Sequence, residues 1–210
     1  FTNINRDLVA SVKKIQNCGL EVQGGFIVGF DSDPISIFKN QISFIQRSGI
    51  VTAMVGLLNA PPGTRLYQRL KKENRLLKSF SGDNTDCSLN FIPKMNYETL
   101  INGYKHILNT IYSPKPYYER VKTLLKEYKP QKRKARPQLQ FYHIKAFFKS
   151  IWFLGIREKG RRYFWKLLAS TLLRHPRSFP LSISLSVYGF HFRKIVEKYT
   201  STPIEDTPVL

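Results

Sequence analysis

Two short segments of the chain hold small residues in an arrangement that suits the binding of a flat ligand. In the first, residues 24–31 (GGFIVGFD), Gly25, Ile27 and Gly29 share one face if the segment is an extended strand. Two of these positions lack side chains and the third is aliphatic, so a heterocycle can lie against them and reach backbone hydrogen-bonding groups. Close packing of a helix needs the same residues, so composition alone leaves both interpretations open.

The second segment, residues 57–64 (LLNAPPGT), contains a Pro-Gly turn, after which Thr64 can cap a helix. Taken alone, it indicates a rigid connection between a strand and a helix. If both segments end parallel strands of one sheet, their loops meet at the edge where α/β proteins bind ligands. Together they predict a site at that edge.

The elements that would position these segments alternate between helix and strand. A helix ending at Gly19 precedes a strand over residues 21–30, and a helix starting near Pro34 precedes a strand over residues 51–58. The strands start about thirty residues apart, the length of a βαβ unit with parallel strands. Neither alternates with polar residues, which is typical of a sheet covered on both faces. We therefore predict an α/β fold, either a barrel or an open parallel sheet.

The remainder of the chain is predicted to be mainly helical. A short helix follows Thr64, Asn96 caps a longer one, and another follows Pro114. Residues 129–138 (KPQKRKARPQ) carry five positive charges and no negative one, so we predict an extended linker and a domain boundary. Beyond the linker, the pattern predicts three helices, over residues 140–155, 158–174 and 181–198.

Positive charge is concentrated in the second half of the chain. Residues 1–112 hold 13 Lys and Arg against 8 Asp and Glu, whereas residues 113–210 hold 21 against 6. This imbalance predicts an anionic partner for the second half, either nucleic acid or a phospholipid surface. The longest apolar stretch, residues 179–192, is too short to span a bilayer, and no signal peptide is visible. The two distant cysteines fit no disulfide framework, so we expect a reducing, cytoplasmic compartment.

The basic tail also contains amphipathic helices rich in aromatic residues. Residues 141–152 present a broad apolar face with Lys145 and Lys149 outside it. Such helices suit the membrane interface, with rings at the headgroups and cations on anionic lipid. Packing on the barrel with solvated charges is the second interpretation. Nucleic-acid binding ranks third, because the apolar stretches are too extensive for a simple RNA groove.

Other polar clusters carry little signal. The loop at residues 83–86 (DNTD) has too few ligands at defined spacing for a metal site. The four histidines are scattered, and we find no nucleophile with a matching base and no phosphate loop.

Several blocks of the sequence resemble a known family, the cobalamin-binding radical S-adenosylmethionine (SAM) proteins. GFIVGFD resembles the motif on the fifth barrel strand of radical SAM enzymes, and APPGT resembles the PGT turn that follows their sixth strand. Residues 62–76, 90–108 and 111–128 are similar to the C-terminal region of the cobalamin-binding members, which includes a domain known only by a number. The resemblance extends through YGFHFRKI to about residue 198.

The resemblance implies that residues 1–78 are the last βα units of a partial radical SAM (TIM-like) barrel, followed by a helical extension at 79–128 and the basic tail at 139–210. It implies contacts with the adenine of SAM from two sets of residues. The stronger set is Gly25, Ile27, Gly29, Phe30 and Asp31, and the weaker set is Leu58, Asn59 and Ala60.

Two features of the family are absent from these 210 residues. They are the Cys-x3-Cys-x2-Cys motif that holds a [4Fe-4S] cluster and the cobalamin-binding domain. The resemblance therefore implies a C-terminal fragment that partners with upstream regions of the same protein and is inactive alone. The whole protein would be a cobalamin-dependent enzyme, such as a methyltransferase acting on a lipid-like carbon, peripheral at the inner face of the membrane. The alternatives are a non-catalytic membrane- or nucleic-acid-binding module on an α/β scaffold, and an unrelated α/β barrel.

Overall fold

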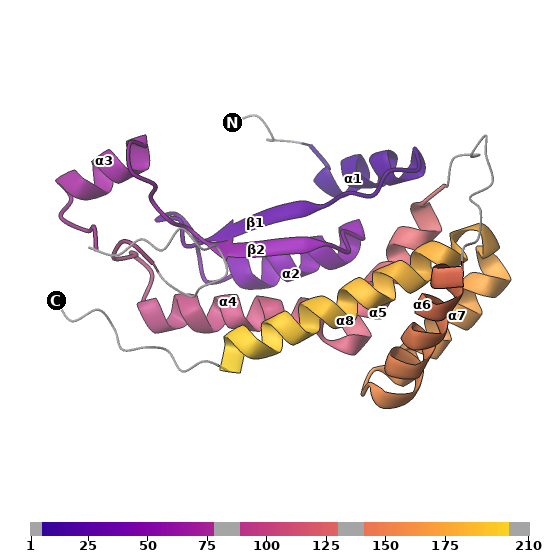
Figure 1. Cartoon of the computed structure of the whole chain (residues 1–210). Coiled ribbons are helices and arrows are strands. Elements are labelled where there is room, and N and C mark those ends of the chain that lie inside the picture. The colour runs from indigo at the N-terminus through magenta and orange to yellow at the C-terminus, as the bar shows by residue number, and fades with distance from the viewer. Residues whose placement is uncertain (1–5, 78–88, 130–140, 202–210) are drawn as a thin grey trace.

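The computed structural model describes residues 6–77, 89–129 and 141–201, and it is a mixed α/β structure made mostly of helices (Figure 1). The N-terminal elements confirm the predicted alternation of helix and strand. They are α1 (Leu8–Asn17), β1 (Gly24–Val28), α2 (Ile37–Ser48), β2 (Ala53–Leu57) and α3 (Arg65–Lys72).

The second half of the described chain is helical. It comprises α4 (Tyr97–Tyr112), α5 (Pro114–Glu127), α6 (Phe141–Ser150), the π-helix η1 (Ile151–Arg157), α7 (Arg161–Arg174), the 3-10 helix η2 (Pro176–Ser178) and α8 (Phe179–Ser201). The three predicted tail helices are thus confirmed, with η1 directly continuing α6. None of the described helices is both long and apolar enough to cross a membrane.

β1 and β2 form a parallel pair, as predicted, in which Gly24 lies opposite Ala53 and Val28 opposite Leu57. Both strands are shorter than expected. β1 ends because Gly29 takes a φ of +106°, which glycine tolerates. The N–H groups of Gly29 and Phe30 then donate to the Asp33 carboxylate, each at 3.0 Å.

Only one face of this two-stranded sheet is covered by the described residues. Val28, Val55 and Leu57 are buried on the side where α2 and α4 pack. On the other face, Ile27 and Met54 are 48% and 64% exposed. The expectation of two covered faces is therefore wrong for this part of the chain. The absence of polar alternation did not predict this bare face, because the residues on it are glycines and aliphatic side chains rather than polar ones.

One core connects the sheet to the helices. α4 contacts α2, α5, α8 and β2, and buried side chains continue from Val28 to Val196. α8 is fixed on α5 where the Tyr117 ring covers Gly189 and its hydroxyl donates to the Leu185 carbonyl at 2.6 Å. The predicted linker at 129–138 lies outside the described residues except for Lys129, and the domain boundaries remain predictions.

Candidate functional site

The bare face of the sheet offers room for a ligand. A Cβ atom placed on Gly25 would meet no atom within 4 Å. Across the pair lies the exposed Met54, and two residues along β1 lies the exposed Ile27. This face combines open backbone with aliphatic side chains, which is the surface that a flat heterocycle needs.

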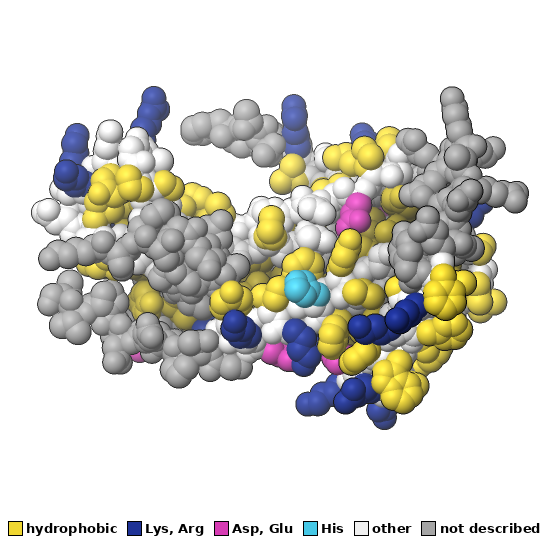
Figure 2. Space-filling model, in the orientation of Figure 1, with side chains coloured by type: hydrophobic (Ala, Val, Ile, Leu, Met, Phe, Trp, Pro, Cys, Tyr) yellow, Lys and Arg dark blue, Asp and Glu magenta, His cyan; other side chains and the backbone are white. Residues whose placement is uncertain are grey.

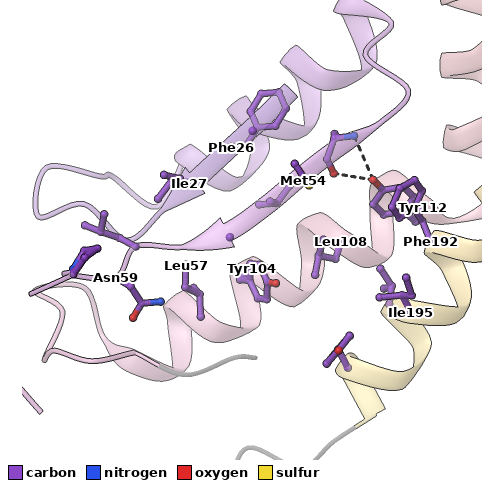
Figure 3. Close-up of a pocket in the computed structure, with 18 residues that line it drawn as sticks. Phe26, Ile27, Met54, Leu57, Asn59, Tyr104, Leu108, Tyr112, Phe192 and Ile195 are labelled. Atoms are coloured by element: carbon purple, nitrogen blue, oxygen red, sulfur yellow. Dashed lines mark hydrogen bonds between the residues drawn. The ribbon is translucent and has the colours of Figure 1, made fainter. Parts of the chain in front are cut away.

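An apolar groove of about 610 Å³ continues from this face past the outer edge of β2. Its far walls are α4, through Tyr104 and Leu108, and α8, through Phe192 and Ile195 (Figure 3). Asn59, just beyond the carboxyl end of β2, lines the same groove. The volume lies within the range of about 300–1,000 Å³ typical of small-molecule sites. The groove can therefore hold an apolar molecule next to the strand ends.

The outer edge of β2 has no strand beside it among the described residues, but one side chain binds its backbone at Ala53 and another binds the backbone just after the strand. The Tyr112 hydroxyl donates to the Ala53 carbonyl at 2.7 Å and accepts from the Ala53 N–H at 3.3 Å. Three residues beyond the end of β2, the Asn90 side chain donates to the Ala60 carbonyl at 2.7 Å and accepts from its N–H at 2.8 Å. Both side chains are buried, and burial raises the pKa of Tyr112. The Tyr112 hydroxyl thus takes the place of a neighbouring strand at Ala53, and Asn90 fixes the backbone that leaves β2.

Asp31 is bound by two arginines. Its carboxylate pairs with Arg75 in a two-pronged contact at 2.7 and 3.0 Å, and with Arg69 at 2.9 Å. The hydrogen bond from Arg75 is the main reason that the pKa of Asp31 lies below its usual value. This ion pair ties the loop after β1 to α3 and the segment that follows it, which makes Asp31 a structural anchor of the strand ends.

The predicted site residues of the first segment fall into four environments. Gly25 and Ile27 lie on the bare face, as their spacing predicted. Gly29 does not share that face: it is buried, and a Cβ there would lie 3.2 Å from Leu100. Phe30 is 44% exposed beyond the strand end, whereas Asp31 is held by its arginines.

The second set lies beside the first, because Leu57 at the end of β2 is paired with Val28. Leu58 and Ala60 are buried, and their backbone N–H groups donate to Val28 and Asn90. Of these three residues, only Asn59 lines the groove with a polar side chain. The contact of these residues with SAM stays a prediction, and Gly25, Ile27 and Asn59 are the members with room for a ligand.

Sequence reasoning missed the residues that hold the strand ends in place. Asp33 lies in the segment where the sequence predicts only the start of a helix near Pro34, but its carboxylate fixes the turn after β1. Asn90 and Tyr112 were not singled out. Each bonds a backbone group 30 or 59 residues away, so no local pattern could identify it.

No group of three or more potential metal ligands comes together within residues 6–77, 89–129 and 141–201. Cys18 is exposed on the surface. Cys87 and the DNTD loop lie outside the described residues.

Comparison with known proteins places the chain among methyltransferase relatives. A family described as "Domain of unknown function (DUF4070)" matches residues 64–203. An uncharacterized methyltransferase of Synechocystis sp. is 32% identical over 98% of this chain and 39% of its own length. A hopanoid C-2 methylase of Rhodopseudomonas palustris is 28% identical over 82% of this chain and 33% of its own length. The chain thus spans well under half of either relative, and no solved structure matches it significantly.

Proposed function

Since this chain belongs to the DUF4070 family, we propose that it is the C-terminal part of a SAM-dependent methylase with a radical SAM barrel. In this proposal β1 and β2 are the last two strands of the barrel, and their bare face turns toward its interior. The relatives named as methyltransferase and methylase support the reaction class. The observation that carries the proposal is a parallel strand pair whose uncovered face is formed by glycine and aliphatic residues.

The residues on this face fit the adenine of SAM. The ring would lie against Gly25 and Ile27, where backbone and an aliphatic side chain are exposed. The Asn59 amide at the end of β2 would supply a hydrogen-bonding group at the rim. When bound, SAM supplies the group that reacts. The role of the described residues is to position it and to exclude water from one side.

The same proposal assigns the [4Fe-4S] cluster and cobalamin to parts of the protein outside these 210 residues. The sequence lacks the three-cysteine motif, and its resemblance to cobalamin-binding radical SAM proteins supports the second cofactor. The chain alone is then expected to be inactive, because it supplies only one wall of the SAM site.

We propose that the groove between β2, α4 and α8 binds the substrate that is to be methylated. Its apolar lining favours a hydrocarbon-rich molecule, and it opens next to the strand ends where SAM would lie. The name of one relative, a hopanoid methylase, agrees with such a substrate. We further propose that the basic tail keeps the enzyme at the inner face of the membrane, because a hydrocarbon-rich substrate partitions into the bilayer.

Graded substitution of Gly25 tests the SAM site. Gly25→Ala, Gly25→Val and Gly25→Leu add increasing volume in open space, so they should leave the fold intact. In the complete protein with its cofactors, equilibrium dialysis with labelled SAM should show affinity falling in that order. We expect a loss of about tenfold or more for Gly25→Leu, which corresponds to about 1.4 kcal/mol. Unchanged affinity in a folded Gly25→Leu protein would contradict the proposal.

A further inference from the structure

The α6–α7 hairpin, residues 141–178, carries a dense set of exposed apolar side chains. Eight of them are at least 45% exposed, namely Phe141, Ile144, Phe148, Trp152, Ile156, Trp165, Leu172 and Leu173. Figure 2 shows large hydrophobic side chains beside lysines and arginines at the end of the molecule where Figure 1 places α6 and α7. Water-exposed helices rarely hold so many rings and branched aliphatic groups unless another surface covers them.

The hairpin is also strongly cationic. Residues 141–178 contain nine Lys and Arg and one acidic residue, Glu158. Glu158 forms an ion pair outside the hairpin, because its carboxylate accepts a hydrogen bond from the Arg193 guanidinium of α8 at 2.6 Å. Within the part of the chain that the structure describes, none of the nine cations forms an ion pair. Their charge is therefore available to an external anion.

The hairpin has a separate face that attaches it to the protein. Phe164 and Leu167 of α7 are fully buried, and α7 contacts α5 and α8. The hydrophobic residues of this inner face are used in folding, so they do not explain the outer ones. Packing on the described part of the protein accounts for one side of α7 and leaves the exposed rings and leucines without a structural role.

One of the exposed rings, that of Trp165, is held in a fixed position. The Trp165 indole N–H donates to the Gly155 carbonyl at 2.9 Å, and its ring packs so closely on Gly155 that a Cβ there would lie 3.0 Å from it. This contact locks α7 against η1 while 46% of Trp165 stays exposed. A surface organised before binding loses little conformational entropy when it binds.

We infer that the outer face of the α6–α7 hairpin docks on a membrane surface that contains anionic phospholipid. Rings and aliphatic groups enter the boundary between headgroups and acyl chains, and the surrounding lysines and arginines contact lipid phosphates. Charge complementarity selects this partner over an apolar protein surface. Exposed Leu172, Leu173 and Ile156 select it over RNA, because aliphatic side chains offer bases neither stacking nor hydrogen bonds. The inference specifies the proposed tail docking and is independent of the methylase activity.

Vesicle sedimentation of the complete protein tests this docking. The probes are phosphatidylcholine vesicles with and without phosphatidylglycerol. The wild type should sediment with the anionic vesicles, and added salt should weaken this binding because it screens the charges. Two double variants separate the contributions: Phe148→Ser with Trp152→Ser removes exposed rings, and Arg161→Gln with Arg162→Gln removes exposed charge. The charge variant should lose about fivefold in binding for each cation removed.

The matched control is the double variant Ile35→Ser with Lys39→Gln. Ile35 is an exposed aliphatic residue in the loop before α2, and Lys39 is an exposed cation on α2. This control should bind vesicles like the wild type. The docking is refuted if the wild type does not sediment with anionic vesicles, or if both hairpin variants bind these vesicles as well as the control does. It is also refuted if a gel shift shows that RNA binds more tightly than the vesicles and requires the same residues. SAM binding measured on the same samples reports on the methylase proposal separately, since neither variant touches the sheet.

Discussion

Two of the apolar surfaces that the described residues expose, the bare face of the β1–β2 sheet and the outer face of the α6–α7 hairpin, are built differently. The sheet face is made of open backbone and a few aliphatic side chains, at Gly25, Ile27 and Met54. The hairpin presents large rings and leucines among nine cations. A surface that leaves its backbone open suits a shaped ligand or a neighbouring strand, whereas projecting rings with cations suit a fluid, anionic boundary.

A buried arginine of the core gives a second contrast with the hairpin. Arg120 of α5 is 1% exposed and donates to carbonyl groups of Ile111 and Val51 at 2.8 and 3.2 Å. The Tyr112 and Tyr117 rings lie 5.7 and 5.2 Å from its guanidinium carbon. Burial lowers the pKa of Arg120 to about 10, so the group is still charged at neutral pH. The hairpin cations are exposed instead, and those with contacts, such as Arg157 over the Phe153 ring and Arg161 with the Ile156 carbonyl, make them within the hairpin. Substitution of Arg120 should therefore cost much more stability than substitution of a hairpin cation.

Arg120→Leu should cause the largest loss of stability. It leaves the carbonyls at the end of α4 and before β2 without their donor, each costing about 1 kcal/mol or more, and it empties the space between the two rings. We expect the free energy of unfolding to fall by about 3 kcal/mol or more in urea titrations. The matched control is Arg157→Leu on the hairpin, which should change it by less than about 0.5 kcal/mol. Equal free energies of unfolding for the two variants would contradict the claim that the buried arginine stabilises the fold and the exposed one does not.

Two glycines, Gly25 within β1 and Gly29 just after it, should respond in opposite directions. Gly29→Ala forces a side chain onto a φ of +106° and against Leu100, so it should destabilise the protein by about 1–2 kcal/mol. Gly25→Ala meets open space in a strand and should be neutral or stabilising by up to about 1 kcal/mol. Thermal melts of both variants provide the comparison. A destabilising Gly25→Ala would mean that another part of the protein already packs on the bare face.

Asp31 should make stability at the strand ends depend on pH. Its folded pKa is lowered, chiefly by the hydrogen bond from Arg75, so the ion pair stabilises the protein at pH values above the ordinary carboxyl pKa of about 4. That contribution is lost as pH falls through the lowered folded pKa. Asp31→Asn should therefore cost about 1–2 kcal/mol at neutral pH. Melts of the variant and wild type should converge toward acid pH, and a constant difference would contradict this role.

Local sequence patterns predicted the elements that are stabilised locally. Asn96 and Thr64 cap helices through bonds to N–H groups three residues on, at 3.0 and 3.2 Å, and both were expected from residue type and position. The parallel pairing followed from the spacing of the strands. The supports of the site depend on distant contacts: Asn90 with Ala60, Tyr112 with Ala53, and Arg120 with Val51. Their residue types occur throughout the chain, so only the folded arrangement distinguishes them.

Removing the exposed rings of the hairpin should have the smallest effect on folding. Phe148 and Trp152 are 65% and 55% exposed, so replacing both with serine should change the free energy of unfolding by less than about 0.5 kcal/mol for each site. Urea titration in the absence of lipid measures this directly. If the double variant is strongly destabilised, these rings pack on some other part of the protein, and the hairpin resembles the rest of the core. If it keeps its stability and loses its vesicle binding, the rings contribute to the membrane contact and not to the fold.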